Sequence, residues 1–378
     1  MDINQEANGM REDLEEFRRA LHQCPETAFH EMMTMEYIRE HLEQWGISYR
    51  LLDPTGIIAA IGSGGKETIA LRADMDALEV EEETGLDFAS LNHGCMHACA
   101  HDGHTAILMA AAKILKQHEK ELNRRILLLF QPAEEIAQGA KMLLKTGLLE
   151  DVKKILGLHI FSGIPAGRIS LEPGRRMAAT NWFSIRITGK SGHAGKPHEC
   201  ADAAVAASSL VINLQNIISR NLDPLEPVVL TIGKMTAGTA RNVIAGEALL
   251  EGTVRTFSIE AQELVQRRMK EIAQAAEKMY QTEISVDFQP ASHPALVNSE
   301  EVVSQVLKGA QDVFEPWEWV KVPAMMLGED FANYLEEMDG CFAFVGGGEG
   351  YPNHHEQFDF NEDALVAGLR LMLVFAYV

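Results

Sequence analysis

Hydrophobic positions in the first third of the chain, and again near its end, follow helical and strand-like spacings in alternation. Helical spacing occurs over 10–21, 31–45, 105–117 and 363–377. Short apolar runs with the length of buried strands occupy 57–61, 68–72, 125–130, 155–160 and 341–345. Strands that alternate with helices in this way predict an α/β fold in which helices sandwich a mostly parallel sheet.

Between residues 181 and 292 the pattern changes. Strand-like and helical segments follow one another as β-α-β-β-α-β, over 182–188, 201–218, 228–234, 248–257, 259–280 and 283–288. This order is typical of a ferredoxin-like split unit. We therefore predict a catalytic domain formed by 1–180 and 293–378, and an inserted α+β satellite domain, a lid or dimerisation domain, over 181–292.

Length and charge agree with this organisation and exclude some partners. A chain of 378 residues is long for one core and favours two domains. Its hydrophobic content of 46% and charged content of 23% are typical of a folded globular protein. A formal charge of −22, with no cluster of Lys and Arg, argues against nucleic acid as a partner.

Cysteine usage and the N-terminus point to a reducing compartment. The five cysteines are odd in number and show no repeated pairing, which argues against a disulfide framework. The N-terminal residues are polar and acidic, without the apolar core of a signal peptide. No stretch approaches the ~18 apolar residues that span a membrane. We expect a cytoplasmic protein with no membrane partner.

Polar residues follow four of the apolar runs, at the point where each predicted strand ends. They are Asp74 and Asp76, Glu134 and Glu135, His159, and His354 with His355. In open α/β sheets, ligands bind at the carboxyl ends of the strands. Side chains separated by roughly 280 positions in the sequence are therefore expected to meet in one crevice.

The densest polar cluster is MHACAHDGH, over 96–104. Cys99 and His101 are two residues apart and can face one ion if they lie in a turn before the helix that starts at 105. A thiolate and an imidazole suit zinc or a neighbouring transition metal. Asp102 is a candidate helix cap, and His104 a supporting or packing residue. A histidine-rich turn without a ligand is the alternative.

Two further clusters offer carboxylates. The strand before Glu134 and Glu135 must end at or before Pro132, which cannot donate to the sheet. Adjacent side chains point in different directions, so one carboxylate can bind metal while the other takes a proton from water. One of the two aspartates after 68–72 can orient a metal-binding histidine. A solvated glutamate pair and turn-forming aspartates are the alternatives.

Taken in order, the motifs resemble those of the M20 metallopeptidases. The resemblance is to the amidohydrolase branch, which includes aminoacylases, hippurate hydrolases and plant auxin-conjugate hydrolases. The matching motifs are LHQCPE at 21–26, LRADMDAL at 71–78, MHACAHDGH at 96–104, QPAEE at 131–135, GLH at 157–159, GHA at 192–194, NVI at 242–244, GTVR at 252–255, GEDF at 328–331 and the segment 354–358. Seven or more motifs in order are highly specific.

The resemblance implies a set of metal ligands, including two histidines that taken alone indicate only a core and a surface residue. These ligands are Cys99, His101, Glu135, His159 and His354. They would hold two divalent ions. Because the ligand set mixes nitrogen, oxygen and sulfur donors, it leaves the identity of these ions open among Mn, Zn, Co and Ni.

The resemblance also implies roles in catalysis and substrate binding. Glu134 becomes the general base, and Asp76 the carboxylate that orients the site. His193 becomes a donor to the developing oxyanion, in the same subunit or from a partner. Asn242 and Arg255 become candidates to bind the amino acid's carboxylate, the arginine in a bidentate contact.

Four positions depart from the family's pattern without removing a ligand or the base. Glu79 and Ala245 stand where proline is usual, and Ala100 stands where glycine is usual. The segment 354–358 lacks the proline often found there. These departures leave loop shape and substrate choice open.

We therefore predict a metal-dependent amidohydrolase. Its reaction is the hydrolysis of the amide bond of N-acyl amino acids, such as N-acetyl amino acids, or of amino-acid conjugates. Metal-activated water and a glutamate base perform it. Alternatives are a dipeptidase or aminopeptidase of the same fold and a non-catalytic metal- or ligand-binding protein. A homodimer or higher homo-oligomer is plausible, whereas the acyl group, the amino acid and the native metal stay open.

Overall fold

The computed structural model describes residues 1–62, 65, 67–289 and 293–378. The chain divides into two compact units. Unit 1 comprises Met1–Arg176, Val297–Pro323 and Asp330–Val378, and unit 2 comprises Met177–Leu296 and Ala324–Glu329. The short segment Ala324–Glu329 belongs to unit 2, where the carbonyl of Leu327 accepts the backbone N–H of Ala178 at 2.9 Å. The predicted satellite boundary at 292 lies outside the described residues.

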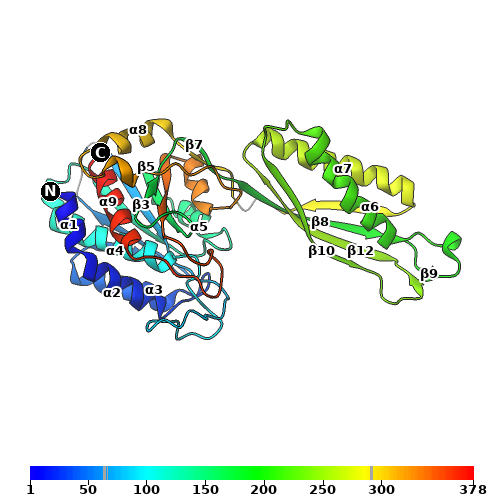
Figure 1. Cartoon of the computed structure of the whole chain (residues 1–378), viewed down its shortest axis with the longest axis horizontal. Helices are drawn as coiled ribbons and strands as arrows, with labels where there is room; N and C mark the ends of the chain where they lie inside the picture. Colours follow the sequence, from blue (N-terminus) through cyan, green and yellow to red (C-terminus); the bar gives the residue numbers. More distant parts are fainter. Residues whose placement is uncertain (63–64, 66, 290–292) are drawn as a thin grey trace. The chain divides into compact units, whose positions relative to one another are not determined.

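The core of unit 1 is a seven-stranded sheet in the order β1-β2-β4-β3-β5-β15-β6. Its strands are β1 (Ser48–Leu51), β2 (Ile57–Ile61), β3 (Thr68–Asp74), β4 (Arg125–Gln131), β5 (Val152–Phe161), β6 (Ile169–Ser170) and β15 (Asp339–Gly346). The four strands β4, β3, β5 and β15 run parallel, and the pairings at both edges are antiparallel. Helices flank this sheet (Figure 1), so the predicted α/β class is confirmed.

Burial on both faces explains the continuous apolar runs of the central strands. In β4 every residue from Ile126 to Gln131 is buried, as expected for a strand covered on both sides. The helices of unit 1 are α1 (Ile3–Gly9), α2 (Arg11–His22), α3 (Met32–Gln44), α4 (His101–Gln117), α5 (Gly139–Lys145), α8 (Glu300–Gly309) and α9 (Asp363–Tyr377). Helices α4 and α9 are apolar around most of their circumference because they pack on each other and on the sheet.

Unit 2 is a four-stranded antiparallel sheet with two helices. Its strands, in the sheet order β10-β12-β8-β13, are β10 (Val228–Ala237), β12 (Glu247–Thr256), β8 (Ala179–Thr188) and β13 (Glu283–Phe288). Helices α6 (Ala203–Asn216) and α7 (Ile259–Tyr280) contribute Leu210 and Met269 to a core they share with the sheet. The first and third strands of the unit lie at the centre, which is the arrangement of a ferredoxin-like split unit (Figure 1).

Some element limits differ from those predicted. Helix α4 begins at His101, four residues before the predicted start at 105, because the turn that precedes it is made at Ala100, whose φ is 65°. Helix α6 continues as a π-helical turn, Ile217–Asn221.

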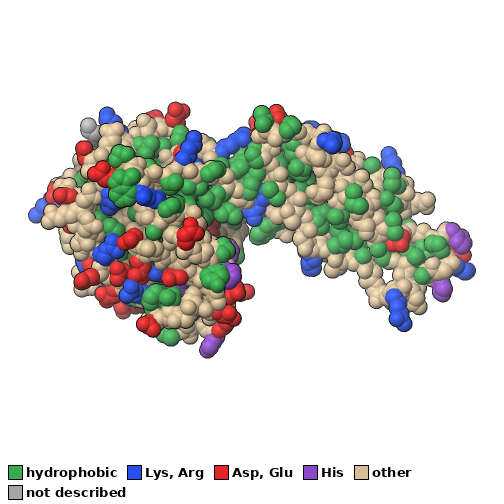
Figure 2. All heavy atoms as spheres, viewed as in Figure 1, with side chains coloured by type: hydrophobic (Ala, Val, Ile, Leu, Met, Phe, Trp, Pro, Cys, Tyr) green, Lys and Arg blue, Asp and Glu red, His purple; other side chains and the backbone are tan. Residues whose placement is uncertain are grey.

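Acidic side chains are spread over the visible face of unit 1 (Figure 2), in line with the charge of −22. Within the described part of the chain, no helix is both long and apolar enough to cross a membrane.

A buried charge cluster attaches helix α2 to the first turn of α4. His22 Nδ1 lies 2.8 Å from the Asp102 carboxylate, and Arg18 Nε lies 3.4 Å from the same oxygen. Arg18 and His22 are each 1% exposed. Burial lowers the pKa of His22, but the hydrogen bond and charge of Asp102 outweigh it and raise that pKa to about 9. The pair therefore contains a protonated histidine at neutral pH.

The His22–Asp102 pair predicts a pH-dependent stability. Because the folded pKa of His22 is raised above its ordinary value of 6.5, its stabilisation is complete below about pH 6.5 and is lost as pH rises through about 9. His22→Gln is therefore expected to lower the melting temperature more at about pH 6 than at about pH 9.5. Thermal unfolding followed by circular dichroism measures this. His93→Gln, at a histidine whose side chain is 96% exposed, is the control, and an equal loss at both pH values for His22→Gln would contradict the assignment.

Candidate metal centre

The candidate site lies at the end of the unit 1 sheet that is formed by the carboxyl ends of its parallel strands. Because β3, β4, β5 and β15 are parallel, their carboxyl ends point to the same edge. Asp76 follows β3, Glu134 and Glu135 follow β4, and His159 lies near the end of β5. His354 stands in the loop after β15, and its N–H donates to the carbonyl of Ala98 at 2.7 Å. Topology alone thus gathers these four segments.

The Cys99 thiol lies at the centre of the predicted ligands. Its Sγ is 3.3 Å from His159 Nε2 and 3.3 Å from His354 Nε2. Ligand atoms of Cys99, His101 and His159 lie within 4.8 Å of one another, and so do those of Cys99, Glu135 and His354. The two groups share the thiol, so they describe two neighbouring positions for an ion.

Glu135 lies between the histidines of these two groups. Its Oε1 is 3.8 Å from His101 Nε2 and 3.6 Å from His354 Nε2. Ligand atoms of His101, Glu134 and Glu135 also lie within 4.8 Å of one another. The structure therefore brings all five predicted ligands, and the predicted base, into one cluster.

Hydrogen bonds fix which ring nitrogens of two histidines face the cluster. His101 Nδ1 lies 2.9 Å from the carbonyl oxygen of Asp76, and His159 Nδ1 lies 2.8 Å from that of Ile160. A carbonyl only accepts, so each Nδ1 carries the hydrogen and donates it, as is usual for metal-binding histidines. The Nε2 atoms of His101 and His159 therefore face the centre of the cluster.

Two buried atoms at this centre lack hydrogen-bond partners among the described residues. They are His101 Nε2 and Glu135 Oε1. An unsatisfied buried polar atom costs about 1–3 kcal/mol, so such atoms need an explanation. A cation between them satisfies both, and the thiol, imidazole and carboxylate donors suit a divalent transition metal. The residues therefore fit a metal centre.

Burial controls the charge of the donors in the absence of a cation. It raises the pKa of the Cys99 thiol well above its ordinary value and raises the pKa of Glu135 to about 7. It also lowers the pKa of His159 well below its ordinary value, which keeps that ring neutral and its lone pair available. Bound cations would supply the positive charge that the thiolate and the carboxylate need here.

Asp76 fixes the loop that carries both glutamates. Its Oδ1 and Oδ2 accept the backbone N–H groups of Glu134 and Glu135, each at 3.0 Å. The carboxylate is fully buried, and its Oδ1 also lies 3.4 Å from His101 Nδ1. One side chain thus orients the predicted base and two predicted ligands.

A second buried carboxylate, Glu31, supports the same loop from the other side. It accepts the N–H of Ala133 at 3.0 Å and the hydroxyl of Thr55 at 2.6 Å. Ala133 has a φ of 55°, in the left-handed region, so this turn needs such a support. Sequence reasoning missed Glu31, because it lies in the segment assigned to the helix over 31–45.

His104 has the supporting role expected for it. Its Nε2 accepts the N–H of Ile160 at 2.8 Å, so its Nδ1 carries the hydrogen and donates to Asp74 at 2.6 Å. Two expectations for this region are corrected. His101 opens helix α4 and does not lie in a turn before it, and Asp102 makes no capping bond because it lies inside the helix, where its Oδ2 contacts His22 and Arg18.

His193 and Asn242 lie next to each other in unit 2. β9 (Gly192–His193) pairs with β11 (Val243–Ile244), and the N–H of Ala194 donates to the carbonyl of Asn242 at 3.2 Å. His193 is exposed, and its Nδ1 accepts the N–H of Gly195 at 3.0 Å. A neutral His193 ring therefore presents Nε2–H as a donor.

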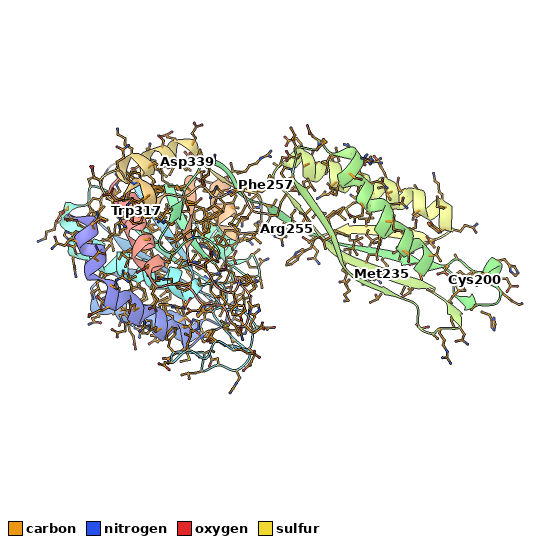
Figure 3. The ribbon with its side chains drawn as sticks, viewed as in Figure 1. Cys200, Met235, Arg255, Phe257, Trp317 and Asp339 are labelled. Atoms are coloured by element: carbon orange, nitrogen blue, oxygen red, sulfur yellow. The ribbon has the colours of Figure 1, made fainter. Side chains whose placement is uncertain are left out.

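Arg255 does not join these two residues. Residues Thr180 and Arg255 pair at one end of β8 and β12, whereas Thr188 pairs with Glu247 at the other end. Eight residues of strand span roughly 26 Å. Figure 3 shows Arg255 and Cys200, close in sequence to His193, at opposite ends of this sheet. Arg255 donates to the Thr180 hydroxyl at 2.8 Å, and burial lowers its pKa.

Comparisons with known proteins place this chain in a family. The model of peptidase family M20/M25/M40 matches residues 70–377. The chain is 39% identical to the N-acetyl-L-cysteine deacetylase of Bacillus subtilis over 355 residues, which cover 92% of this chain and 84% of that protein. It is 38% identical to an IAA-amino acid hydrolase of Arabidopsis thaliana over 359 residues, which cover 93% of this chain and 81% of that protein.

A solved structure agrees with these relatives. A dinuclear metal binding peptidase of the M20 family from Bacillus subtilis superposes with a TM-score of 0.86 at 34% identity, and the match covers 98% of each chain. The resemblance drawn from the motifs is confirmed. The chain belongs to peptidase family M20/M25/M40, and it is a hydrolase that acts on amide bonds.

Proposed function

We propose that this protein removes the acyl group from N-acyl amino acids, or from related amino-acid conjugates, by metal-dependent hydrolysis of the amide bond. The supporting observation is the cluster of thiol, imidazole and carboxylate donors with Glu134 beside it. The relatives named for N-acetyl-L-cysteine deacetylation and for IAA-amino acid hydrolysis act on substrates of this class. The expected cytoplasmic location is part of the same proposal.

Two divalent ions are proposed for the two overlapping donor groups, with Mn, Zn, Co and Ni as candidates. Cys99 and Glu135 lie between the positions, and His101, His159 and His354 complete them. Ions bound there would acidify water and polarise the substrate's carbonyl oxygen.

Glu134 is the proposed general base. Asp76 fixes its backbone, and its Oε1 accepts the N–H of Asp330 at 3.2 Å, so the carboxylate has a defined position beside the donor cluster. It takes a proton from the attacking water and gives it to the departing amine. The neighbouring Glu135 is oriented differently, toward His101 and His354.

The substrate-binding residues of unit 2 support a site shared between two copies of the chain. His193 is proposed to donate Nε2–H to the carbonyl oxygen that becomes an oxyanion. Asn242 lies beside it, whereas Arg255 lies roughly 26 Å or more away along the sheet. A small N-acyl amino acid cannot span that distance. Arg255, proposed to bind the substrate carboxylate, and His193 with Asn242 would therefore come from different subunits of a homodimer.

A substrate panel tests the reaction class. N-acetyl amino acids and dipeptides are offered to the protein with Mn, Zn, Co or Ni, and release of the free amino acid is measured. Preferential hydrolysis of N-acetyl amino acids is expected. Preference for dipeptides would assign the chain to a peptidase function, and failure on every amide with every metal would favour a non-catalytic binding role.

Glu134→Gln is expected to lower kcat by about two to four orders of magnitude while metal content stays unchanged. The amide retains the size of the side chain but cannot take a proton from water. Steady-state kinetics and elemental analysis measure both quantities. Glu349→Gln, at an exposed carboxylate after β15, is the control. A Glu134→Gln variant with normal turnover would show that the base is another group.

Cys99→Ala is expected to weaken metal binding by at least about tenfold, the loss seen on removal of even a supporting residue. The reason is that Cys99 belongs to both donor groups. Metal-to-protein ratios after dialysis measure the effect, with Cys200→Ala in unit 2 as the control. Unchanged stoichiometry in Cys99→Ala would rule out the proposed ligand set.

Mixed subunits test whether His193 acts from a partner. Glu134→Gln and His193→Ala should each be nearly inactive alone. After subunit exchange, each mixed dimer has one site with intact Glu134 and a partner's intact His193, so roughly a quarter of wild-type activity is expected. Activity assays before and after exchange, with the oligomeric state checked by light scattering, measure this. A mixture that stays inactive would exclude action in trans.

A further inference from the structure

The motif Gly328-Glu329-Asp330-Phe331 contains a buried carboxylate that the proposed reaction does not use. Asp330 is 0% exposed and is the first residue of unit 1 after the segment Ala324–Glu329 of unit 2. Its backbone N–H donates to Glu134 Oε1 at 3.2 Å. The peptide at the junction of the two units thus contacts the proposed base directly.

Three donors from unit 1 hold the Asp330 side chain. Oδ1 accepts from Arg72 at 2.9 Å and from Gln131 Nε2 at 2.8 Å, and Oδ2 accepts the N–H of Ala140 at 2.9 Å. All three partners are donors, so only an acceptor-only side chain satisfies every contact. These three bonds tie the Asp330 side chain to unit 1.

The donors are themselves fixed by close packing. Arg72 is fully buried, and its other nitrogens donate to Gln131 Oε1 at 2.9 Å and to Asp74 at 2.6 Å. Helix α5 approaches the carboxylate because it starts at Gly139, where a Cβ would lie 1.7 Å from the carbonyl oxygen of Pro132. Both groups that bind the Asp330 carboxylate, the Arg72 side chain and the start of helix α5, are thus held in place within unit 1.

From this geometry we infer that Asp330 is a positioning residue for Glu134. Its anchored carboxylate holds its own N–H against the base, and so fixes the direction in which the base faces water. This inference rests on the proposed function, since it assumes that Glu134 takes the proton. It assigns no contact between Asp330 and the substrate or the reacting atoms.

Asp330→Asn tests the inference. The amide has the same shape, but its NH2 group must face one of the three donors, so the anchor fails on one side. We expect kcat to fall by about tenfold or more, the effect of one hydrogen bond to a charged group, with KM and metal content unchanged. Glu318→Gln is the matched control, because it breaks another largely buried carboxylate–arginine pair, with Arg370 at 2.6 Å, and should leave kcat unchanged.

A double-mutant cycle separates positioning of the base from general damage. If Asp330 acts through Glu134, then Asp330→Asn should not lower the residual rate of Glu134→Gln further. A fall by the same factor as in the wild-type background would overturn the inference, and so would a normal kcat or a loss of metal in Asp330→Asn. Normal turnover of Glu134→Gln would instead refute the role of Glu134 as base in the proposed function.

A structural measurement covers the case in which Asp330→Asn does not fold. A crystal structure of the wild-type protein loaded with zinc should place Asp330 N within hydrogen-bond distance of a Glu134 carboxylate oxygen. A separation too long for a hydrogen bond would overturn the inference without any variant.

Discussion

The candidate site depends on one buried carboxylate that accepts two adjacent backbone N–H groups. Asp76 holds the N–H of Glu134 with one oxygen and the N–H of Glu135 with the other. Neighbouring residues normally point their side chains apart, so fixing both amides sets the two glutamates in different directions from one support. Glu135 is directed toward the histidines of the ligand cluster, and Glu134 is left as the proposed base. The carbonyl of Asp76 also sets the tautomer of His101.

Around this support, negative charge is concentrated where water is excluded. Asp74, Asp76, Asp330 and Glu31 are all fully buried, and Arg72 is the cation that contacts two of them. Breaking such a pair by removing one partner is usually far more costly than its net contribution to stability. The network is therefore better understood as a device for orientation than as a source of stability. Divalent ions at the donor groups would complete the charge balance.

Patterning predicted most of the fold, because period and burial are properties that a sequence displays directly. Helices α7 and α9 and strand β13 have the predicted limits, 259–280, 363–377 and 283–288. The start of α4 was missed because it depends on a left-handed residue, Ala100, whose side chain gives no local signal for that conformation. Asp102 was assigned a capping role because its partners, His22 and Arg18, lie about eighty positions earlier in the chain, where local patterning does not reveal them.

The site was less predictable from single residues than from the order of motifs. His159 and His354 have no distinguishing neighbours in sequence. The parallel pairing of β5 with β15, together with the bond from the His354 N–H to the Ala98 carbonyl, brings them beside Cys99. Glu31 and Asp330 escaped assignment because their contacts with the Glu134 loop use backbone groups: Glu31 accepts the N–H of Ala133, and Asp330 donates its own N–H to Glu134. Backbone groups leave no residue type to match. The separation of Arg255 from Asn242 depends on strand register in unit 2, which motif spacing does not contain.

Left-handed backbone at non-glycine residues recurs beside the candidate ligands. Ala100 lies between Cys99 and His101, Ala133 precedes the two glutamates, and His354 itself has a φ of 72°. Each such residue costs roughly 1–2 kcal/mol relative to the ordinary helical region. In a continuous helix, side chains two residues apart do not face each other, so the left-handed residue Ala100 interrupts the helical path between Cys99 and His101. The turn at Ala100 is thus part of the way in which Cys99 and His101 reach the same cluster, and Glu31 supports the corresponding turn at Ala133 by binding its N–H.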